Sequence, residues 1–204
     1  MKKFRFFLRF DREEKWLEAM AEKGWILSDK SLLYSFQQTE PKKRTIKIDY
    51  REFQNKRDYA DYCSLFEESG WKHLAGTKSS GTQYFLKSDK ANGDDIFSDA
   101  LSRAGMYKRY TQMWETWFVL FMPYLCAMDW NFSMLLSPAE WYLTPGLWEL
   151  HGLSFWKAFL FETPFVIFRG IGGWFPLIGM TLCAVMAIKS DCMYRSEKAK
   201  YEKG

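Results

Sequence analysis

The sequence predicts an α+β fold in which a strand–helix–strand–strand unit occurs twice and is followed by two transmembrane helices. Three observations lead to this expectation. The tetrapeptides "EKGW" (22–25) and "ESGW" (68–71) repeat almost the same letters. Each of them follows a stretch with the apolar spacing of a helix. The second half of the chain also contains two long apolar stretches of the kind that cross membranes.

The two copies align with an offset of 46 residues, from Trp25 to Trp71. In the second copy the apolar residues fall at i, i+3, i+4 and i+7, which is one face of a helix. A glycine after each helix suits the left-handed conformation that ends helices, and the tryptophan after it would begin a strand. Asp11 and Asn55 are the expected helix caps. The expected structural anchors are Trp16, Gly24, Trp25, Gly70 and Trp71.

Extended segments flank both helices, at residues 4–10, 25–29, 32–38, 45–53, 71–76 and 82–88. We expect the two units to share one sheet with both helices on one face, because neither unit alone buries enough apolar surface. Along the first strand of each unit, successive side chains point to opposite faces of the sheet. The core side would hold Phe4, Phe6, Leu8, Ile46, Ile48 and Tyr50. The open side would hold Arg5, Phe7, Arg9, Lys47, Asp49 and Arg51.

Charge divides the chain into a soluble part and an apolar part. Residues 1–112 hold 22 Lys and Arg against 17 Asp and Glu, and residues 113–204 hold 7 against 8. The predicted organisation is a cytosolic duplicated domain (1–88), a linker with an amphipathic helix (89–109), a first transmembrane helix (110–130), an aromatic extracytoplasmic interfacial segment (131–164), a second transmembrane helix (165–188) and a basic cytosolic tail (189–204).

The apolar stretches predict two spans in a cell membrane, with both termini in the cytoplasm. Lys and Arg are concentrated before the first span and after the second, and such residues stay on the cytoplasmic side. Asp129 would lie at the far interface if the first span ends at Trp130, and would be buried if it ends at Leu136. The segment between the spans either forms a simple interfacial hairpin or senses a lipid or an amphiphile.

Few residues carry recognisable chemistry. The four cysteines form no C-x-x-C pair, and His73 and His151 would lie on opposite sides of the membrane. There is no glycine-rich phosphate loop and no arrangement of a nucleophile with a base. Asp49 and Glu52 are expected to be solvated charges on a sheet face. The sequence therefore predicts no metal, no cofactor and no enzymatic activity.

The open face of the expected sheet is the candidate binding surface. Basic side chains would converge there if the first strands of the two units are neighbours. The face is then either a solvated surface balanced by Asp49 or a dock for an anionic ligand, a partner protein or lipid headgroups. We expect no nucleic acid, because RNA-binding sheets present rows of aromatic residues and only Phe7 fits. The candidate binding residues are Arg5, Arg9, Lys47 and Arg51.

At "EKWLEAMAEKGW", "LYSF", "KIDYREF" and "LFEESGW" the sequence resembles the bacterial membrane proteins grouped as domain-of-unknown-function family 2812. The resemblance covers about residues 4–88. It implies a cytosolic N-terminal domain followed by membrane spans, genes that neighbour those of PadR-like transcriptional repressors, and no established catalytic residues. The duplicated unit is also similar to ferredoxin-like or gyrase-inhibitor-like two-layer domains, and the gyrase-inhibitor-like group binds ligands.

Two functions fit these observations. The first is a membrane-anchored cytosolic sensor or regulatory domain that binds a small molecule or a partner protein, with a link to transcriptional or envelope-stress regulation. Its expected partners are the lipid bilayer and a protein, either a transcriptional regulator or a membrane complex. The alternative is an accessory subunit of a membrane transporter complex, which would associate through residues 113–188.

Overall fold

The computed structural model describes residues 1–88, 93, 95–127 and 137–202. The protein is an α+β protein that divides into two compact units. The N-terminal unit comprises residues 1–111 together with residues 190–204, and the helical unit comprises residues 112–189. Two long helices, α3 (Ala100–Ala127) and α5 (Gly152–Tyr201), contribute residues to both units.

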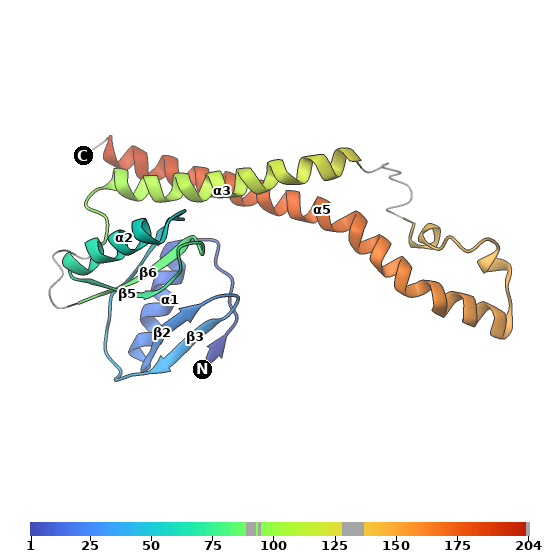
Figure 1. Ribbon diagram of the computed structural model, residues 1–204, viewed down its shortest axis with the longest axis horizontal. Coiled ribbons are helices and arrows are strands. Elements are labelled where there is room, and N and C mark those ends of the chain that lie inside the picture. The colour runs from blue at the N-terminus through green and yellow to red at the C-terminus, as the bar shows by residue number, and fades with distance from the viewer. Residues whose placement is uncertain (89–92, 94, 128–136, 203–204) are drawn as a thin grey trace. The chain divides into compact units, whose positions relative to one another are not determined.

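The N-terminal unit contains the duplicated strand–helix–strand–strand order (Figure 1). The first copy consists of β1 (Lys2–Lys3), α1 (Phe10–Glu22), β2 (Trp25–Lys30) and β3 (Tyr34–Gln38). The second copy consists of β4 (Ile46–Tyr50), α2 (Lys56–Glu68), β5 (Trp71–Ala75) and β6 (Thr82–Lys87). The order of elements is therefore the one that the repeated tetrapeptides predict.

Both helices end at the glycines that the sequence marks. Gly24 and Gly70 have φ angles of 81° and 83°, a left-handed conformation in which a Cβ is disfavoured. Asn55 occupies the predicted N-cap position of α2, whereas the N-cap of α1 is Arg9 and not the predicted Asp11. Neither the Arg9 nor the Asn55 side chain bonds a free amide of its helix. Asp11, the expected first cap, lies inside the first turn of α1, where its negative charge favours the helix dipole.

The two copies form two separate three-stranded antiparallel sheets, so the prediction of a single shared sheet is wrong. The strand order is β1-β3-β2 in one sheet and β4-β6-β5 in the other. Strands β2 and β5 lie close together but belong to different sheets. Helix α1 packs on β2 of its own sheet and on β4 of the other, whereas α2 packs on β5. Helix α1 is therefore the element that holds the two sheets together.

The N-terminal strand is much shorter than predicted, because only Lys2 and Lys3 pair with β3. The expected core residues Phe4, Phe6 and Leu8 are exposed. The corresponding residues of the second copy behave as predicted, and Ile46, Ile48 and Tyr50 are buried.

The inward residue of the N-terminal segment is Phe7, which alternation had placed on the open face. Its ring centroid lies 5.3 Å from that of Trp16 and 6.2 Å from that of Tyr34. The Phe7 side chain thus anchors residues 4–9, although Phe7 was predicted to lie on the open face. The alternation of residues along a strand shows that side chains point to two faces. It does not show which face packs against the rest of the protein.

Two carboxylates of α1 cover the free edge of β4. The Ile48 amide donates to Glu14 Oε1 over 3.0 Å. The Ile46 amide donates to Glu18 Oε1 over 3.2 Å. Burial raises the pKa of Glu14 to about 7, although the nearby charge of Lys47 opposes the shift. A helix therefore satisfies the outward amides of β4, and no further strand pairs with this edge among the described residues.

A buried carboxylate of α1 connects the two sheets directly. The hydroxyl of Tyr34 in β3 and the hydroxyl of Tyr84 in β6 both donate to Glu13 Oε1 over 2.7 Å. Glu13 is 6% exposed. Burial raises the pKa of Glu13, while the two tyrosine hydrogen bonds oppose that shift. The carboxylate is thus a polar junction inside an otherwise apolar core.

The first turns of α3 pack within the N-terminal unit. Ala104, Met106 and Tyr107 are buried, and the Tyr107 hydroxyl donates to Asp11 Oδ1 over 3.2 Å. Helix α3 then continues without a break past the predicted boundary between the linker and the first span at residues 109 and 110. The predicted linker helix and the predicted first span are therefore parts of one helix.

The helical unit contains the apolar segment of α5. Among the described residues, α5 is the one helix long and apolar enough to cross a membrane. It has 50 residues. At 1.5 Å per residue it is about 75 Å long, whereas the hydrocarbon core of a bilayer is about 30 Å thick.

The predicted first span is helical as far as Ala127, and its last residues, 128–130, lie outside the described residues. The described part of that helix does not qualify as a second span.

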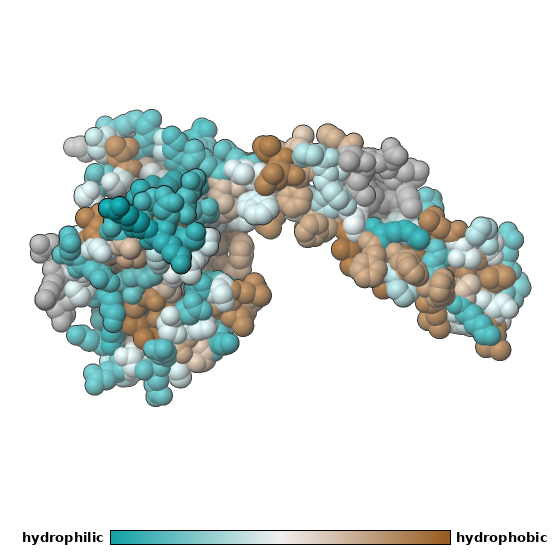
Figure 2. Space-filling model, in the orientation of Figure 1, coloured by the Kyte–Doolittle hydropathy of each residue, from teal (hydrophilic) through white to brown (hydrophobic). Residues whose placement is uncertain are grey.

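Large hydrophobic side chains are exposed along both helices of the helical unit (Figure 2). They include Trp117, Leu120, Phe161, Phe165, Phe168, Ile171, Phe175 and Ile178.

Residues 137–151 fold onto the first turns of α5 through two 3-10 helices, η1 (Pro138–Trp141) and η2 (Leu147–Glu149). The ring of Tyr142 stacks on that of Phe159 at 5.1 Å. The Thr144 amide donates to Glu162 over 3.0 Å, and Glu162 also pairs with Arg169 at 3.2 Å. Aromatic stacking and a paired carboxylate thus hold the segment that precedes the apolar part of α5.

Candidate functional site

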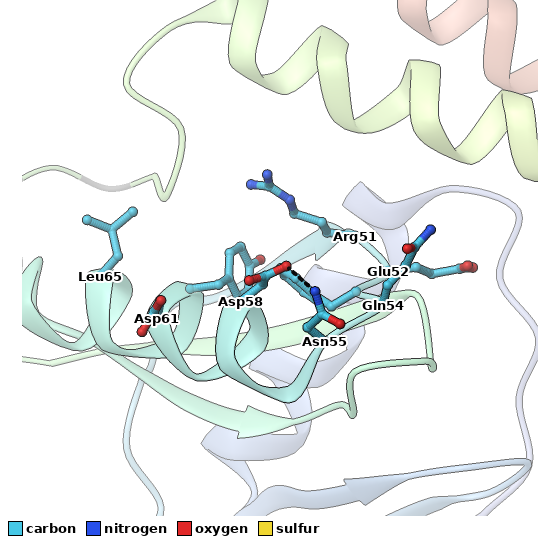
Figure 3. Close-up of a pocket in the computed structure, with 9 residues that line it drawn as sticks. Arg51, Glu52, Gln54, Asn55, Asp58, Asp61 and Leu65 are labelled. Atoms are coloured by element: carbon cyan, nitrogen blue, oxygen red, sulfur yellow. Dashed lines mark hydrogen bonds between the residues drawn. The ribbon is translucent and has the colours of Figure 1, made fainter.

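The candidate site is a cleft between the loop after β4 and the adjacent face of α2. Its volume is about 630 Å³, within the roughly 300–1,000 Å³ range of small-molecule sites. Residues 51–55 form one wall, and one face of α2 forms the other (Figure 3). Its lining residues are Arg51, Glu52, Phe53, Gln54, Asn55, Asp58, Asp61, Tyr62 and Leu65.

The apolar part of the cleft is built from two aromatic rings. The centroids of Phe53 and Tyr62 lie 4.8 Å apart. The guanidinium carbon of Arg51 lies 5.6 Å from the Phe53 centroid and 5.7 Å from the Tyr62 centroid. These distances are within the range of cation–π attraction. The rings therefore already hold one cation, which the chain itself supplies.

The buried carboxylate of Asp49, which pairs with Arg109, fixes the position of Tyr62. Its hydroxyl donates to Asp49 Oδ2 over 2.8 Å, and Arg109 of α3 donates to Asp49 Oδ1 over 2.9 Å. Arg109 also donates from Nε to the carbonyl oxygen of Tyr50 over 2.7 Å. Burial raises the pKa of the Tyr62 hydroxyl, and the charge of Asp49 raises it further. Tyr62 is thus a neutral hydrogen-bond donor with a fixed ring.

Asp49 corrects one prediction from the sequence. It was expected to be a solvated charge, yet it is 3% exposed. Its neighbours Ile48 and Tyr50 are also buried. The partner that makes this burial possible, Arg109, is 60 residues away in the chain. Glu52, by contrast, is exposed as expected.

The loop wall is fixed to the β5–β6 hairpin. The amide of Arg51 donates to the carbonyl of Gly81, and the amide of Phe53 donates to the carbonyl of Lys78, both over 2.7 Å. Gly81 has a φ of 73°, and a Cβ there would lie 2.5 Å from the Tyr50 ring. A side chain at this position is therefore excluded both by conformation and by space. These contacts give the cleft a preformed wall.

The rim of the cleft is acidic. Glu52, Asp58 and Asp61 supply three carboxylates against the single positive charge of Arg51. The Tyr50 hydroxyl donates to Glu52 over 2.7 Å. The side-chain amide of Asn55 donates to Asp58 over 3.4 Å, the bond drawn in Figure 3. The cleft thus combines an aromatic floor with an excess of negative charge.

The four predicted binding residues do not converge on one surface. The prediction assumed that the first strands of the two copies are neighbours, but β1 and β4 belong to different sheets. Arg5 stacks over Phe7, with its guanidinium carbon 5.0 Å from the ring centroid. Arg9 pairs with Asp11 at 2.8 Å in α1.

Lys47 is also separated from the cleft. It pairs with Glu14 at 3.1 Å, and both side chains are largely buried. Of the four candidates, only Arg51 lines the cleft.

The predicted structural anchors are packed in the N-terminal unit. Trp71 is buried, and Trp16 and Trp25 are half-buried. Trp71 shares a core with Tyr62 and Phe85, directly beneath the aromatic floor of the cleft. Of the predicted anchors, Trp71 shares its core with a residue of the cleft, and none of the five lines it.

Sequence reasoning missed both rings of the floor, Phe53 and Tyr62, and the two carboxylates of α2, Asp58 and Asp61. On a helix their pattern is typical of a solvated face, and the cleft becomes evident only when Phe53 and Arg51 approach from the loop. No group of three or more His, Cys, Asp or Glu residues suited to a metal occurs in the described part of the chain. What the arrangement offers chemically is attraction for a cation with apolar surface.

The comparisons with known proteins identify the family of the chain. The sequence matches the family described as "Protein of unknown function (DUF2812)" over residues 9–119, which is more than half of the 204 residues. No curated protein and no solved structure matches the chain significantly. The matched range contains α1, the cleft and the start of α3. The chain therefore belongs to the DUF2812 family of proteins of unknown function.

Proposed function

We propose that this protein is a membrane-anchored sensor whose N-terminal unit binds a small organic cation in the cleft between residues 51–55 and α2. The observation that carries the proposal is the pair of rings, Phe53 and Tyr62, beneath a rim with more carboxylates than cations. Aromatic faces and carboxylates together attract cations that carry apolar groups. Binding without catalysis is proposed because the cleft offers complementary charge and a preformed wall.

The ligand would compete with Arg51 for the aromatic floor. The Arg51 guanidinium lies over both rings. A cationic ligand that displaces Arg51 would move it toward solvent and would repel its charge. A change in the position of the 51–55 loop would then report occupancy to a regulatory partner protein. This is the step by which the cleft would act as a sensor.

We expect the full-length protein in lipid nanodiscs to bind benzyltriethylammonium and not benzenesulfonate, an anion of similar size. The double variant D58N/D61N should bind the cation roughly fivefold to tenfold more weakly, because two partly screened charges are lost. Isothermal titration calorimetry, corrected with empty nanodiscs, would measure the affinity. Glu68→Gln, an exposed change on the same helix outside the cleft, is the matched control and should leave the affinity unchanged.

The variant Arg51→Ala decides between a cation site and an anion site. It should tighten cation binding roughly twofold to fivefold, since it uncovers the rings and removes a positive charge. If Arg51 instead served an anionic ligand, the same variant would abolish binding of benzenesulfonate. Loss of benzyltriethylammonium binding in Arg51→Ala would therefore contradict the proposed cation site.

The membrane arrangement proposed here has two spans, residues 110–130 and 165–188, with both termini in the cytoplasm. It is supported by the apolar length of α5, by the exposed hydrophobic side chains of the helical unit and by the charge of the flanking residues. In a cysteine-free background, an impermeant maleimide applied to intact cells should label Ser154→Cys and not Ser79→Cys. Labelling of Ser79→Cys before lysis, or recovery of the chain in the soluble fraction, would contradict this topology.

The second candidate function is an accessory subunit of a membrane complex such as a transporter. It is favoured by the apolar segment of α5, of which 22% is buried within the protein. The remaining surface could face lipid or a second membrane protein. Stoichiometric co-purification through residues 112–189 in mild detergent would support this function over the sensor.

A further inference from the structure

The N-terminal segment displays large hydrophobic side chains that the fold does not use. Phe4 is 69% exposed, Phe6 is 60% exposed, and Leu8 is also exposed. Single exposed hydrophobic residues are common on soluble proteins, but contiguous exposed apolar patches mark interaction surfaces.

A second element lies beside this segment. Lys3 pairs with Tyr34 at the start of β3, next to the turn that joins β2 and β3. Leu32 in that turn is 77% exposed. Phe4, Phe6, Leu8 and Leu32 are called the N-terminal patch below.

The segment of residues 4–9 is held at both ends, so its exposed side chains have a fixed position on the fold. At one end, Lys2 and Lys3 are paired with β3. At the other end, Phe10 is buried and starts α1. Between them, Phe7 packs against Trp16. The neighbouring side chains of Phe4, Phe6 and Leu8 are exposed.

The charges around the N-terminal patch are basic. The first ten residues contain Lys2, Lys3, Arg5 and Arg9 and no acidic residue. Arg9 pairs with Asp11, whereas none of the ion pairs found among the described residues involves the other three. Asp29, in β2 near the turn, is an acidic residue close to the patch along the chain.

We infer that the N-terminal patch docks on the headgroup layer of an anionic bilayer, with Phe4 and Phe6 inserted and the basic residues on lipid phosphates. Aromatic side chains and Lys or Arg together are the composition that binds at such interfaces. A second copy of the chain is a poorer occupant, because it would bring the same positive charges against each other. The inference is independent of the cleft and adds a second lipid contact to the proposed anchor.

The test uses the full chain in nanodiscs of phosphatidylcholine alone or with about one-third phosphatidylglycerol. Hydrogen–deuterium exchange over residues 4–9 should slow severalfold with the anionic lipid. The variant F4S/F6S should lose this protection and keep its fold, because both replaced side chains are exposed. Leu101→Ser, an exposed apolar residue on α3 outside the cleft, is the matched control and should keep the protection.

The charge variant K2Q/R5Q gives an independent measurement. Each basic residue near an anionic surface contributes roughly a fivefold factor to binding, so the docking equilibrium should fall by roughly 25-fold. Raising the salt concentration to 1 M should have a similar effect, because the Debye length falls to about 3 Å.

Three results would overturn the inference. They are equal exchange in both lipid compositions, protection that survives in F4S/F6S, and protection that depends on protein concentration and not on lipid. The last result would assign the patch to a contact between copies. If the chain failed to enter nanodiscs, the proposed anchoring would be wrong, and vesicles added to the chain would still measure docking.

Discussion

Replacing Asp49 with alanine is expected to lower the free energy of unfolding by about 2–4 kcal/mol. The change leaves the buried Tyr62 hydroxyl without its acceptor and removes the ion-pair partner of Arg109. The Arg109 side chain is partly solvated, which keeps the expected loss below the upper end for fully buried pairs. Thermal unfolding of the full chain, followed by near-ultraviolet circular dichroism, would measure the change.

Asp61→Ala is the matched control for this prediction. It removes a carboxylate of the same unit that is exposed, and it should change stability by no more than about 0.5 kcal/mol. Asp49→Ala should also weaken cation binding, because Tyr62 forms the floor of the cleft. An unfolding free energy equal to that of the control would show that Asp49 is not the anchor described above.

The second large effect is expected at Glu13, where alanine should cost about 2–4 kcal/mol. Both the Tyr34 and the Tyr84 hydroxyls would lose their acceptor in a buried site. Because these tyrosines belong to different sheets, the two sheets should also unfold less cooperatively. Hydrogen exchange in β3 and β6 would show this as unequal rates of opening.

Variants of Glu13 that keep or remove its hydrogen-bond acceptor separate the contribution of the hydrogen bonds to stability from the contribution of packing. Glu13→Gln keeps an acceptor oxygen and should cost less than Glu13→Ala. The triple variant E13L/Y34F/Y84F removes all three polar groups together and should be close to neutral, since no buried group is left unsatisfied. Equal losses in Glu13→Ala and in this triple variant would contradict the role given to the hydrogen bonds. Glu22→Ala, exposed on the same helix, is the surface control.

The sequence predicts the helices and hairpins of the N-terminal unit well, because their signals are local. Gly24 and Gly70 mark the helix ends through their own backbone conformation. The number of sheets is not a local property. It depends on how strands far apart in the chain meet: β2 and β5 lie close together without joining into one sheet. The edge of β4 is covered by Glu14 and Glu18, from a helix some thirty residues earlier in the chain. On a helix surface such residues have the pattern of solvated charges.

The candidate site is predictable only in part for the same reason. Arg51 follows a strand at a position where an outward basic residue is expected, and it does line the cleft. Phe53, Asp58 and Asp61 join it because the 51–55 loop is fixed to the β5–β6 hairpin. Nothing in the spacing of these residues indicates that contact. The burial of Asp49 likewise depends on Arg109, a long-range partner.

The cover on β4 has a consequence for the chain as it leaves the ribosome. An open strand edge is a template on which another chain can polymerise. The outward amides of Ile46 and Ile48 are occupied by carboxylates of α1, which is synthesised before β4. The helix that covers this edge therefore precedes β4 in synthesis, and we expect it to limit pairing between nascent chains through the edge.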